Sequence, residues 1–146
     1  MGDKERGYAH RVDIRADAQL VWRALTEVEQ LRRWCSPAAE ISPRHGGHFR
    51  ASVDRVTEFD AHIDVFEPGR RLRLIYLRSP ELPPAESVIV DDLILDAVPG
   101  GTIVRLLGSG IPATAQWDTQ YRRLRTGWAQ AMTRLKVIVE QQGASV

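Results

Sequence analysis

The stretch VWRALTEVEQLRRWC, Val21 to Cys35, decides the expected fold, because it places two short helices between a first strand and a run of later strands. Apolar residues recur at helical spacing in AQLVWRALT, which predicts a helix over Ala18–Thr26 with one buried stripe. Asp17 precedes this helix and offers an N-cap oxygen to its first turn. A second short helical piece follows over Glu27–Trp34. Pro37 ends it, because the residue before a proline is pushed out of the helical region.

Outside this stretch the apolar pattern mostly has a period of two, which is typical of strands whose side chains alternate between two faces. The turns EPGR and PGG separate neighbouring runs, since Pro and Gly suit the central positions of tight turns. We therefore expect strands over Tyr8–Ile14, His45–Val53, Glu58–Phe66, Arg71–Arg78, Ser87–Val98 and Gly101–Gly110, with the last two forming a hairpin.

One long helix is predicted over Thr114–Gln142, where apolar residues alternate steps of four and three. Gly127 inside this helix costs about 1 kcal/mol relative to Ala, which predicts close packing at that point. The order of elements indicates an α+β fold, in which a curved antiparallel sheet covers the long helix and leaves a space between them. With 146 residues the chain fits one domain, with an ordered core over about residues 8–142.

Composition and charge exclude several classes of function. A formal net charge of +1 provides no long-range field for nucleic acid or a membrane surface. No apolar run approaches the ~20 residues of a membrane span, and the first ten residues carry no apolar core of a signal peptide. A single Cys excludes an internal disulfide and a Cys-based zinc site. We expect a cytoplasmic protein.

The sequence resembles the START-like, helix-grip superfamily (SRPBCC), and within it the small proteins named after the activator of the heat-shock-protein-90 ATPase. The resemblance covers about Val12 to Glu140, and its segments appear in the family's order and spacing. They are VDIRADAQLVWRALTEVEQLRRW (Val12–Trp34), GGHFR (Gly46–Arg50), VFEPGRRLRLIY (Val65–Tyr76), GGTIVRLLGSGIP (Gly100–Pro112) and GW (Gly127–Trp128). The family often carries an aromatic residue after the tryptophan of the second helix, and this chain has Cys35 there.

The resemblance implies a cavity between the sheet and the last helix, and we expect it to hold a small apolar or aromatic molecule. Inward alternation and the helix stripe predict its lining. The predicted lining residues are Trp34, Phe49, Phe59, Ile63, Tyr76, Trp117, Trp128 and Met132. Specificity would come from a few polar groups, such as the Tyr76 hydroxyl or one Asp.

Two alternative functions stay open beside ligand binding. The first is a chaperone-associated protein of the stress response, as the family name suggests. We place it lower, because the eukaryotic activators carry an additional amino-terminal domain for which this chain has no room. The second is an enzyme of the cyclase or hydrolase type that uses the same cavity. It is also placed lower, and it would need a polar pair inside the cavity.

Few residues suggest catalysis, a metal or a cofactor. The sequence contains no glycine-rich phosphate loop, no serine nucleophile elbow and no helical pair of metal-binding histidines. His45 and His48 bracket a glycine pair and are interpreted as loop residues at a strand entrance, since a metal site needs three or four ligands. Cys35 has two readings: a small buried hydrophobic residue, which we favour, or a reactive thiol. We predict no cofactor, no metal and no catalytic residue.

Two groups of charged residues leave alternatives open. His62 lies between two aspartates on one strand face, which is either a solvated row or a His–carboxylate pair. Asp91-Asp92 interrupts an apolar strand, so one of the two must face inward if the strand is covered on one side. A buried carboxylate needs a partner, and we expect an ion pair with Arg105 across the hairpin. A catalytic role for Asp91, Asp92 or His62 is the alternative.

Self-association is also predicted, because the strand over Ser87–Val98 carries apolar residues on both faces. Val88, Val90 and Ile94 oppose Ile89, Leu93 and Leu95. A two-fold homodimer is the commonest way to cover an apolar outer face.

Overall fold

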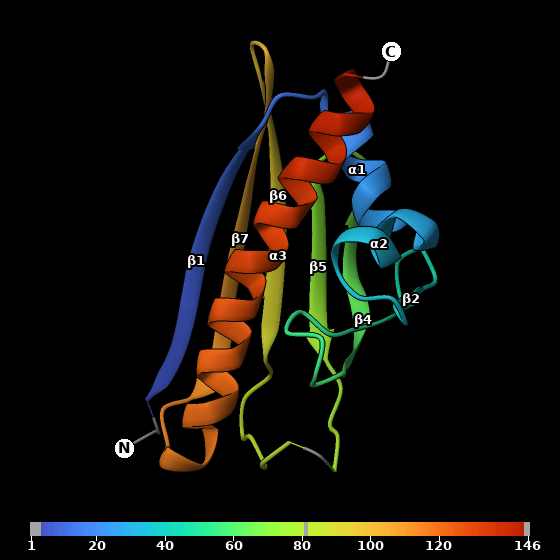
Figure 1. The fold of residues 1–146 in the computed structure, drawn as a ribbon. Coiled ribbons are helices and arrows are strands. Elements are labelled where there is room, and N and C mark those ends of the chain that lie inside the picture. The colour runs from blue at the N-terminus through green and yellow to red at the C-terminus, as the bar shows by residue number, and fades with distance from the viewer. Residues whose placement is uncertain (1–3, 81, 145–146) are drawn as a thin grey trace.

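The computed structural model describes residues 4–80 and 82–144. Within them one antiparallel sheet has the strand order β1-β7-β6-β5-β4-β3-β2, and the long helix α3 crosses one face of it (Figure 1). The helices α1 and α2 lie beside the C-terminal part of α3. In chain order the elements are β1 (Glu5–Ile14), α1 (Ala18–Thr26), α2 (Val28–Trp34), β2 (Glu40–Ile41), β3 (His48–Ala51), β4 (Phe59–Glu67), β5 (Arg71–Tyr76), β6 (Val90–Val98), β7 (Gly101–Pro112), the 3-10 turn η1 (Ala115–Trp117) and α3 (Asp118–Ala144). This is the predicted α+β helix-grip architecture.

The two short helices form for the reasons that the sequence indicates. The Asp17 carboxylate accepts a hydrogen bond from the Leu20 backbone N–H at 2.8 Å and caps α1. Glu27 separates the helices with an extended backbone (φ −87°, ψ 127°), so it ends α1 and begins α2. Trp34 closes α2 by donating from its indole Nε1 to the Ala24 carbonyl of α1 at 2.7 Å. This bond fixes the angle between the two helices.

Several strand boundaries differ from the predicted ones. The strand expected over His45–Val53 is only His48–Ala51, because Gly46 has a positive φ of 77° and begins a turn. A short strand, Glu40–Ile41, pairs with it and was not predicted. Strand β6 begins at Val90 instead of Ser87, and the three residues before it belong to the loop after β5.

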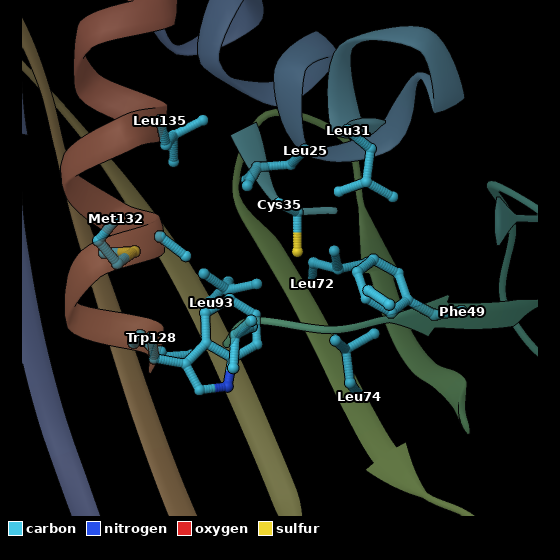
Figure 2. Packing of buried hydrophobic residues seen from close by; sticks show 14 of the residues in the cluster. Leu25, Leu31, Cys35, Phe49, Leu72, Leu74, Leu93, Trp128, Met132 and Leu135 are labelled. Carbon is cyan, nitrogen blue, oxygen red and sulfur yellow. The ribbon is translucent and has the colours of Figure 1, made fainter. Parts of the chain in front are cut away.

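The core lies between the sheet and α3, with α1 and α2 closing one end of it. Figure 2 shows Trp128, Met132 and Leu135 of α3 directed toward Leu72 and Leu93 of the sheet. The predicted stripe of α3 is confirmed at its centre, where Leu124, Trp128, Ala131 and Leu135 are buried.

The predicted close packing at Gly127 is also confirmed. A Cβ there would lie 2.9 Å from a methyl group of Val53 and 3.1 Å from the Val53 carbonyl carbon. The loop after β3 therefore packs directly on the backbone of α3, at a position that only a glycine fits without a shift.

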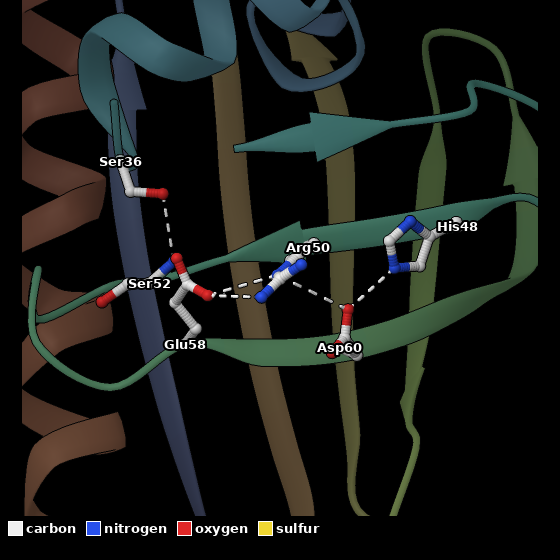
Figure 3. Close-up of polar contacts among 6 residues, drawn as sticks. All are labelled: Ser36, His48, Arg50, Ser52, Glu58 and Asp60. Carbon is white, nitrogen blue, oxygen red and sulfur yellow. Dashed lines mark hydrogen bonds and ion pairs between the residues drawn. The ribbon is translucent and has the colours of Figure 1, made fainter. Parts of the chain in front are cut away.

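The face of the sheet turned away from α3 carries rows of ion pairs. In Figure 3 Arg50 of β3 binds Glu58, with its Nη2 2.8 Å from Oε2, and His48 Nε2 lies 2.8 Å from Asp60 Oδ1. His62 lies on the same face, opposite His48 in the register of β3 and β4. Within residues 4–80 and 82–144, no helix is long and apolar enough to cross a membrane.

Candidate functional site

A buried carboxylate lies at the centre of the sheet's inner face. Asp91 of β6 is fully buried and accepts three side-chain hydrogen bonds. Two come from the hydroxyls of Tyr8 on β1 and Tyr76 on β5, each with an O···O distance of 2.5 Å. The third comes from the indole Nε1 of Trp128 on α3 at 3.0 Å. One carboxylate therefore joins three strands and the long helix, with short bonds typical of an ionised acceptor.

Tyr8 reaches Asp91 because the strand between them carries a glycine. Gly108 of β7 is paired with Tyr8 on one side and with Asp91 on the other. A Cβ at Gly108 would lie 2.4 Å from two carbons of the Tyr8 ring, so the ring lies directly over the glycine. Gly7 precedes Tyr8 at an irregularity in the pairing of β1 with β7. Sequence reasoning missed Tyr8 and Gly108, although a glycine inside an apolar strand is a known signal of close approach.

The Asp91 carboxylate has no cationic partner among the described residues. Its hydrogen bonds come from neutral donors, and no Arg, Lys or His of residues 4–80 and 82–144 forms an ion pair with it. Burial raises the pKa of this carboxyl from 3.8 to about 6, and the three hydrogen bonds offset part of that effect. Burial and then the Asp91 charge raise the pKa of both tyrosines well above its ordinary value, so they remain hydrogen-bond donors.

The predicted ion pair between the Asp91-Asp92 pair and Arg105 is wrong. Arg105 binds Asp96 instead, and Asp92 forms a two-pronged pair with Arg71 on the outer face, with Nε–Oδ1 2.9 Å and Nη2–Oδ2 2.7 Å. The strand register explains the difference. Arg105 lies opposite Ile94 and therefore points to the outer face, whereas Asp91 points inward.

A cavity of about 280 Å³ opens at the end of the sheet where β5 and β6 join through a proline-containing loop. Its wall includes Tyr76, the last residue of β5, and Ile89, which directly precedes β6 and accepts the Tyr76 backbone hydrogen bond; Trp117 of η1 also borders it. The Trp117 indole Nε1 donates to the Pro84 carbonyl at 3.1 Å, which ties the loop to η1. Its lining is Tyr76, Leu77, Arg78, Ser79, Leu82, Pro83, Pro84, Ala85, Glu86, Ser87, Val88, Ile89 and Trp117. We call this space the main cavity because its wall is mostly apolar; two more open surface hollows, at the β5–β6 outer edge and near Lys4, are larger, at about 580 Å³ each.

An aromatic stack continues inward from the main cavity. The Tyr76 ring stacks on Phe59 with centroids 4.6 Å apart and an interplanar angle of 8°. Phe59 in turn lies 6.3 Å from Trp128, centroid to centroid. A second cavity with room for about one water, 10 Å³, borders Phe59 and Tyr76 on the other side of Leu82. Tyr76 is thus shared by the two cavities and by the Asp91 hydrogen-bond network.

All eight predicted lining residues are buried, but the structure brings only part of this set to a cavity wall. Tyr76 and Trp117 border the main cavity, and Phe59 borders the small one. The others are packed in the core between sheet and helices: Trp34, Phe49, Ile63, Trp128 and Met132. Trp128 is linked to the site through its bond to Asp91.

The remaining candidate residues lie apart from the main cavity. Cys35 is completely buried in the core (Figure 2), and burial raises the pKa of its thiol to about 12, which favours a packing role over a reactive one. His62 and Asp92 lie on the outer face, so the structure does not bring Asp91, Asp92 and His62 together. In the part of the chain that the structure describes, no three His, Cys, Asp or Glu residues are placed to hold a metal ion.

A curved antiparallel sheet around a long C-terminal helix, with a cavity at one end, defines a protein of the helix-grip class. The chain belongs to the family described as activator of Hsp90 ATPase homolog 1-like proteins, whose model matches residues 15–140. No curated protein matches it by sequence.

Solved structures share the fold at low sequence identity. A protein of Mesorhizobium loti is 23% identical with a TM-score of 0.79, over 93% of this chain and 98% of that one. A structure described as the Aha1 dimer from Colwellia psychrerythraea is 20% identical with a TM-score of 0.78, over 92% and 96%. CalU16 from Micromonospora echinospora is 20% identical with a TM-score of 0.72, over 97% and 80%. At these identities the likeness establishes the fold alone.

Proposed function

We propose that the protein binds a small, mainly apolar molecule in the main cavity. The observation that carries the proposal is a cavity of about 280 Å³ whose wall combines Tyr76, Ile89 and Trp117 with a loop held in place by hydrogen bonds. This volume is near the lower end of the range of small-molecule sites, about 300 Å³. A ligand of one or two rings would fit it.

Hydrogen bonds hold the described part of the loop beside the main cavity, residues 77–80 and 82–89, which favours binding. Besides the bond from Trp117 to Pro84, the Ser87 hydroxyl donates to the Gly110 carbonyl at 3.1 Å. The Tyr76 backbone N–H donates to the Ile89 carbonyl at 2.9 Å. A wall fixed before binding lowers the entropy lost when a ligand enters.

Of the predicted lining we propose Tyr76 and Trp117 as direct ligand contacts, with Phe59 behind Tyr76. For Trp34, Phe49, Ile63, Trp128 and Met132 contact with a ligand stays a prediction, because they are now closely packed in the core. A location in the cytoplasm likewise stays a prediction. Chaperone association rests on the family name alone and remains the lesser alternative. An enzyme in the same cavity would have to use groups other than Asp92 and His62.

Native mass spectrometry of freshly purified protein tests the proposal first, since a co-purifying small molecule would identify its ligand class. Ala85→Trp, which places a large side chain in the main cavity, should abolish retention of that molecule. Ala97→Trp makes the same change at an exposed position at the other end of β6 and should retain it. Equal retention by both variants would show that the molecule binds elsewhere.

A homodimer is a second proposal, and a different observation favours it. Leu107 is 43% exposed on the outer face of the sheet, between Ala9 of β1 and Asp92 of β6. The fold neighbour from Colwellia psychrerythraea is described as a dimer. Light scattering should then give twice the chain mass for the wild type and one chain mass for Leu107→Lys. A monomeric wild type would refute the proposal.

A further inference from the structure

We infer that the main cavity selects ligands with an apolar or aromatic body and a positively charged amine, because an uncompensated carboxylate, Asp91, lies behind its Tyr76 wall. The inference rests on the proposed function and adds the ligand's charge to it. It follows from three features of the structure: the place of Asp91, the absence of a counter-charge, and the aromatic surface between carboxylate and cavity.

The first feature is the distance between the carboxylate and the cavity. Ile89, at the cavity wall, and Asp91 both direct their side chains inward, and Asp91 is the next inward residue along the chain. Two residues of extended chain span roughly 7 Å, so the charge lies only one side-chain layer behind the wall. Tyr76 connects the two places, because this residue borders the cavity and its hydroxyl binds Asp91.

The second feature is the charge balance around Asp91. The elements packed against it supply Tyr8, Tyr76 and Trp128, all of them neutral donors. Among the described residues that line the cavity, the charged side chains are Arg78 and Glu86, which are exposed and of opposite sign, so solvent screens them and their fields oppose each other. A buried charge without a counter-ion is costly, and a cationic ligand would supply the missing partner.

The third feature is the surface that the ligand would contact. Tyr76 and Trp117 are the ring systems that attract cations most readily over their faces. A short hydrogen bond to a carboxylate increases the electron density of a phenol ring, which strengthens this attraction at Tyr76. At an effective dielectric constant of about 20, a charge roughly 8 Å away favours a cation by about tenfold or more in affinity.

Calorimetric titration with three probes that share a phenyl ring and a two-carbon chain tests the inference. The probes are 2-phenylethylammonium, 2-phenylethanol and phenylacetate. At about pH 8, above the pKa near 6 of Asp91, the cation should bind about tenfold more tightly than the alcohol, and phenylacetate should bind least. At about pH 5 the preference for the cation should shrink, because Asp91 becomes protonated.

Asp91→Asn should abolish both the preference for the cation over the alcohol and its pH dependence. Asp92→Asn is the matched control, since it removes the same charge from the neighbouring residue on the opposite face of the sheet. It should bind like the wild type. If Asp91→Asn does not fold, the pH dependence of ligand binding by the wild type tests the inference. The loss of the preference for the cation between about pH 8 and about pH 5 can be measured without a variant.

Three results would overturn the inference and leave the proposed function standing. They are equal affinity for cation and alcohol, a preference for the cation that does not change with pH, and the same loss of that preference in both variants. Failure of all three probes to bind up to their solubility would also overturn it. The proposed function would then be judged separately, by the co-purified molecule and its dependence on Ala85→Trp.

Discussion

Asp91 is the residue on which the site depends, and three hydrogen-bond donors surround its buried carboxyl group. The three donors form hydrogen bonds to the Asp91 carboxylate, and each donor must lie at the matching position along its strand or helix. The Tyr8 bond depends in addition on a residue that makes no hydrogen bond to the carboxylate, Gly108, whose missing side chain leaves room for the ring. The addition of a single methyl group at Gly108 would therefore be enough to disrupt the hydrogen-bond network around Asp91.

Gly108→Ala should destabilise the protein by about 2–4 kcal/mol, because the new methyl group displaces the Tyr8 ring and breaks a bond to a charged acceptor. Urea unfolding measures the loss. The double variant Gly108→Ala/Tyr8→Phe should lose less stability than the sum of the two single variants, since both changes act on the same hydrogen bond. Ser109→Ala, an exposed neighbour on β7, should change stability by no more than about 0.5 kcal/mol.

The pH dependence of stability should report Asp91 directly. Its pKa is raised from 3.8 unfolded to about 6 folded, so the folded state holds the proton more tightly. The stabilising contribution is fully present below about pH 3.8 and is lost as the pH rises through about 6. The unfolding free energy of wild type minus that of Asp91→Asn should fall by about 1 kcal/mol from about pH 5 to about pH 7. A difference that stays constant would contradict this assignment.

At the scale of elements, α3 is positioned by contacts along its whole length. The loop after β3 packs on it at Gly127, the sheet at Trp128, and α1 and α2 near its C-terminal part. Arg134 also donates from its Nε to the Trp34 carbonyl at 2.7 Å, which ties the helix to the end of α2. At Gly127 the backbone of the helix faces the backbone of Val53 without a side chain between them.

Two identical substitutions in α3 should have opposite effects. In an open helix Gly→Ala gains about 1 kcal/mol, but at Gly127 the new Cβ meets the backbone of Val53, so Gly127→Ala should cost about 1 kcal/mol net. At Gly143 the new Cβ would lie 3.9 Å from a Leu20 methyl group, the nearest neighbour among the described residues outside the helix's own backbone, so Gly143→Ala should be neutral or stabilising. Thermal unfolding of both variants tests the pair. A stabilised Gly127→Ala would disprove the close packing.

For the molecule as a whole, one carboxylate links β1, β5, β6 and α3, and the four tryptophans are buried at four different elements. Trp22 lies in α1, Trp34 in α2, Trp117 in η1 and Trp128 in α3. Sheet and helices thus share one core, which predicts that they unfold together.

Unfolding in urea should accordingly be one cooperative transition. Tryptophan fluorescence reports the helices and their contacts, and far-UV circular dichroism reports the secondary structure. Their transitions should coincide within error. Separate midpoints would show that the chain contains more than one folding unit, against the single domain expected from its length.

The sequence by itself determined the order of the helices and of the strands other than β2, the inner stripe of α3, the cap at Asp17 and the need for close packing at Gly127. These features depend on local periodicity and on the conformational limits of single residues, so a linear pattern contains them. It also showed that one of Asp91 and Asp92 must face inward. The strand ends near Gly46 and Ser87 were missed: Gly46 turns the chain with a positive φ of 77°, and Ser87 belongs to the loop before β6.

Only the tertiary structure decided which aspartate faces inward and what binds it. The register of three strands sets Tyr8, Gly108 and Asp91 in one row, although more than 80 residues separate the tyrosine from the aspartate in the chain. It also turned Arg105 outward, away from the partner expected for it. A one-residue shift in strand pairing reverses which face a side chain takes. Such long-range pairing has no local signal in the sequence, and it places the Asp91 carboxylate behind the cavity.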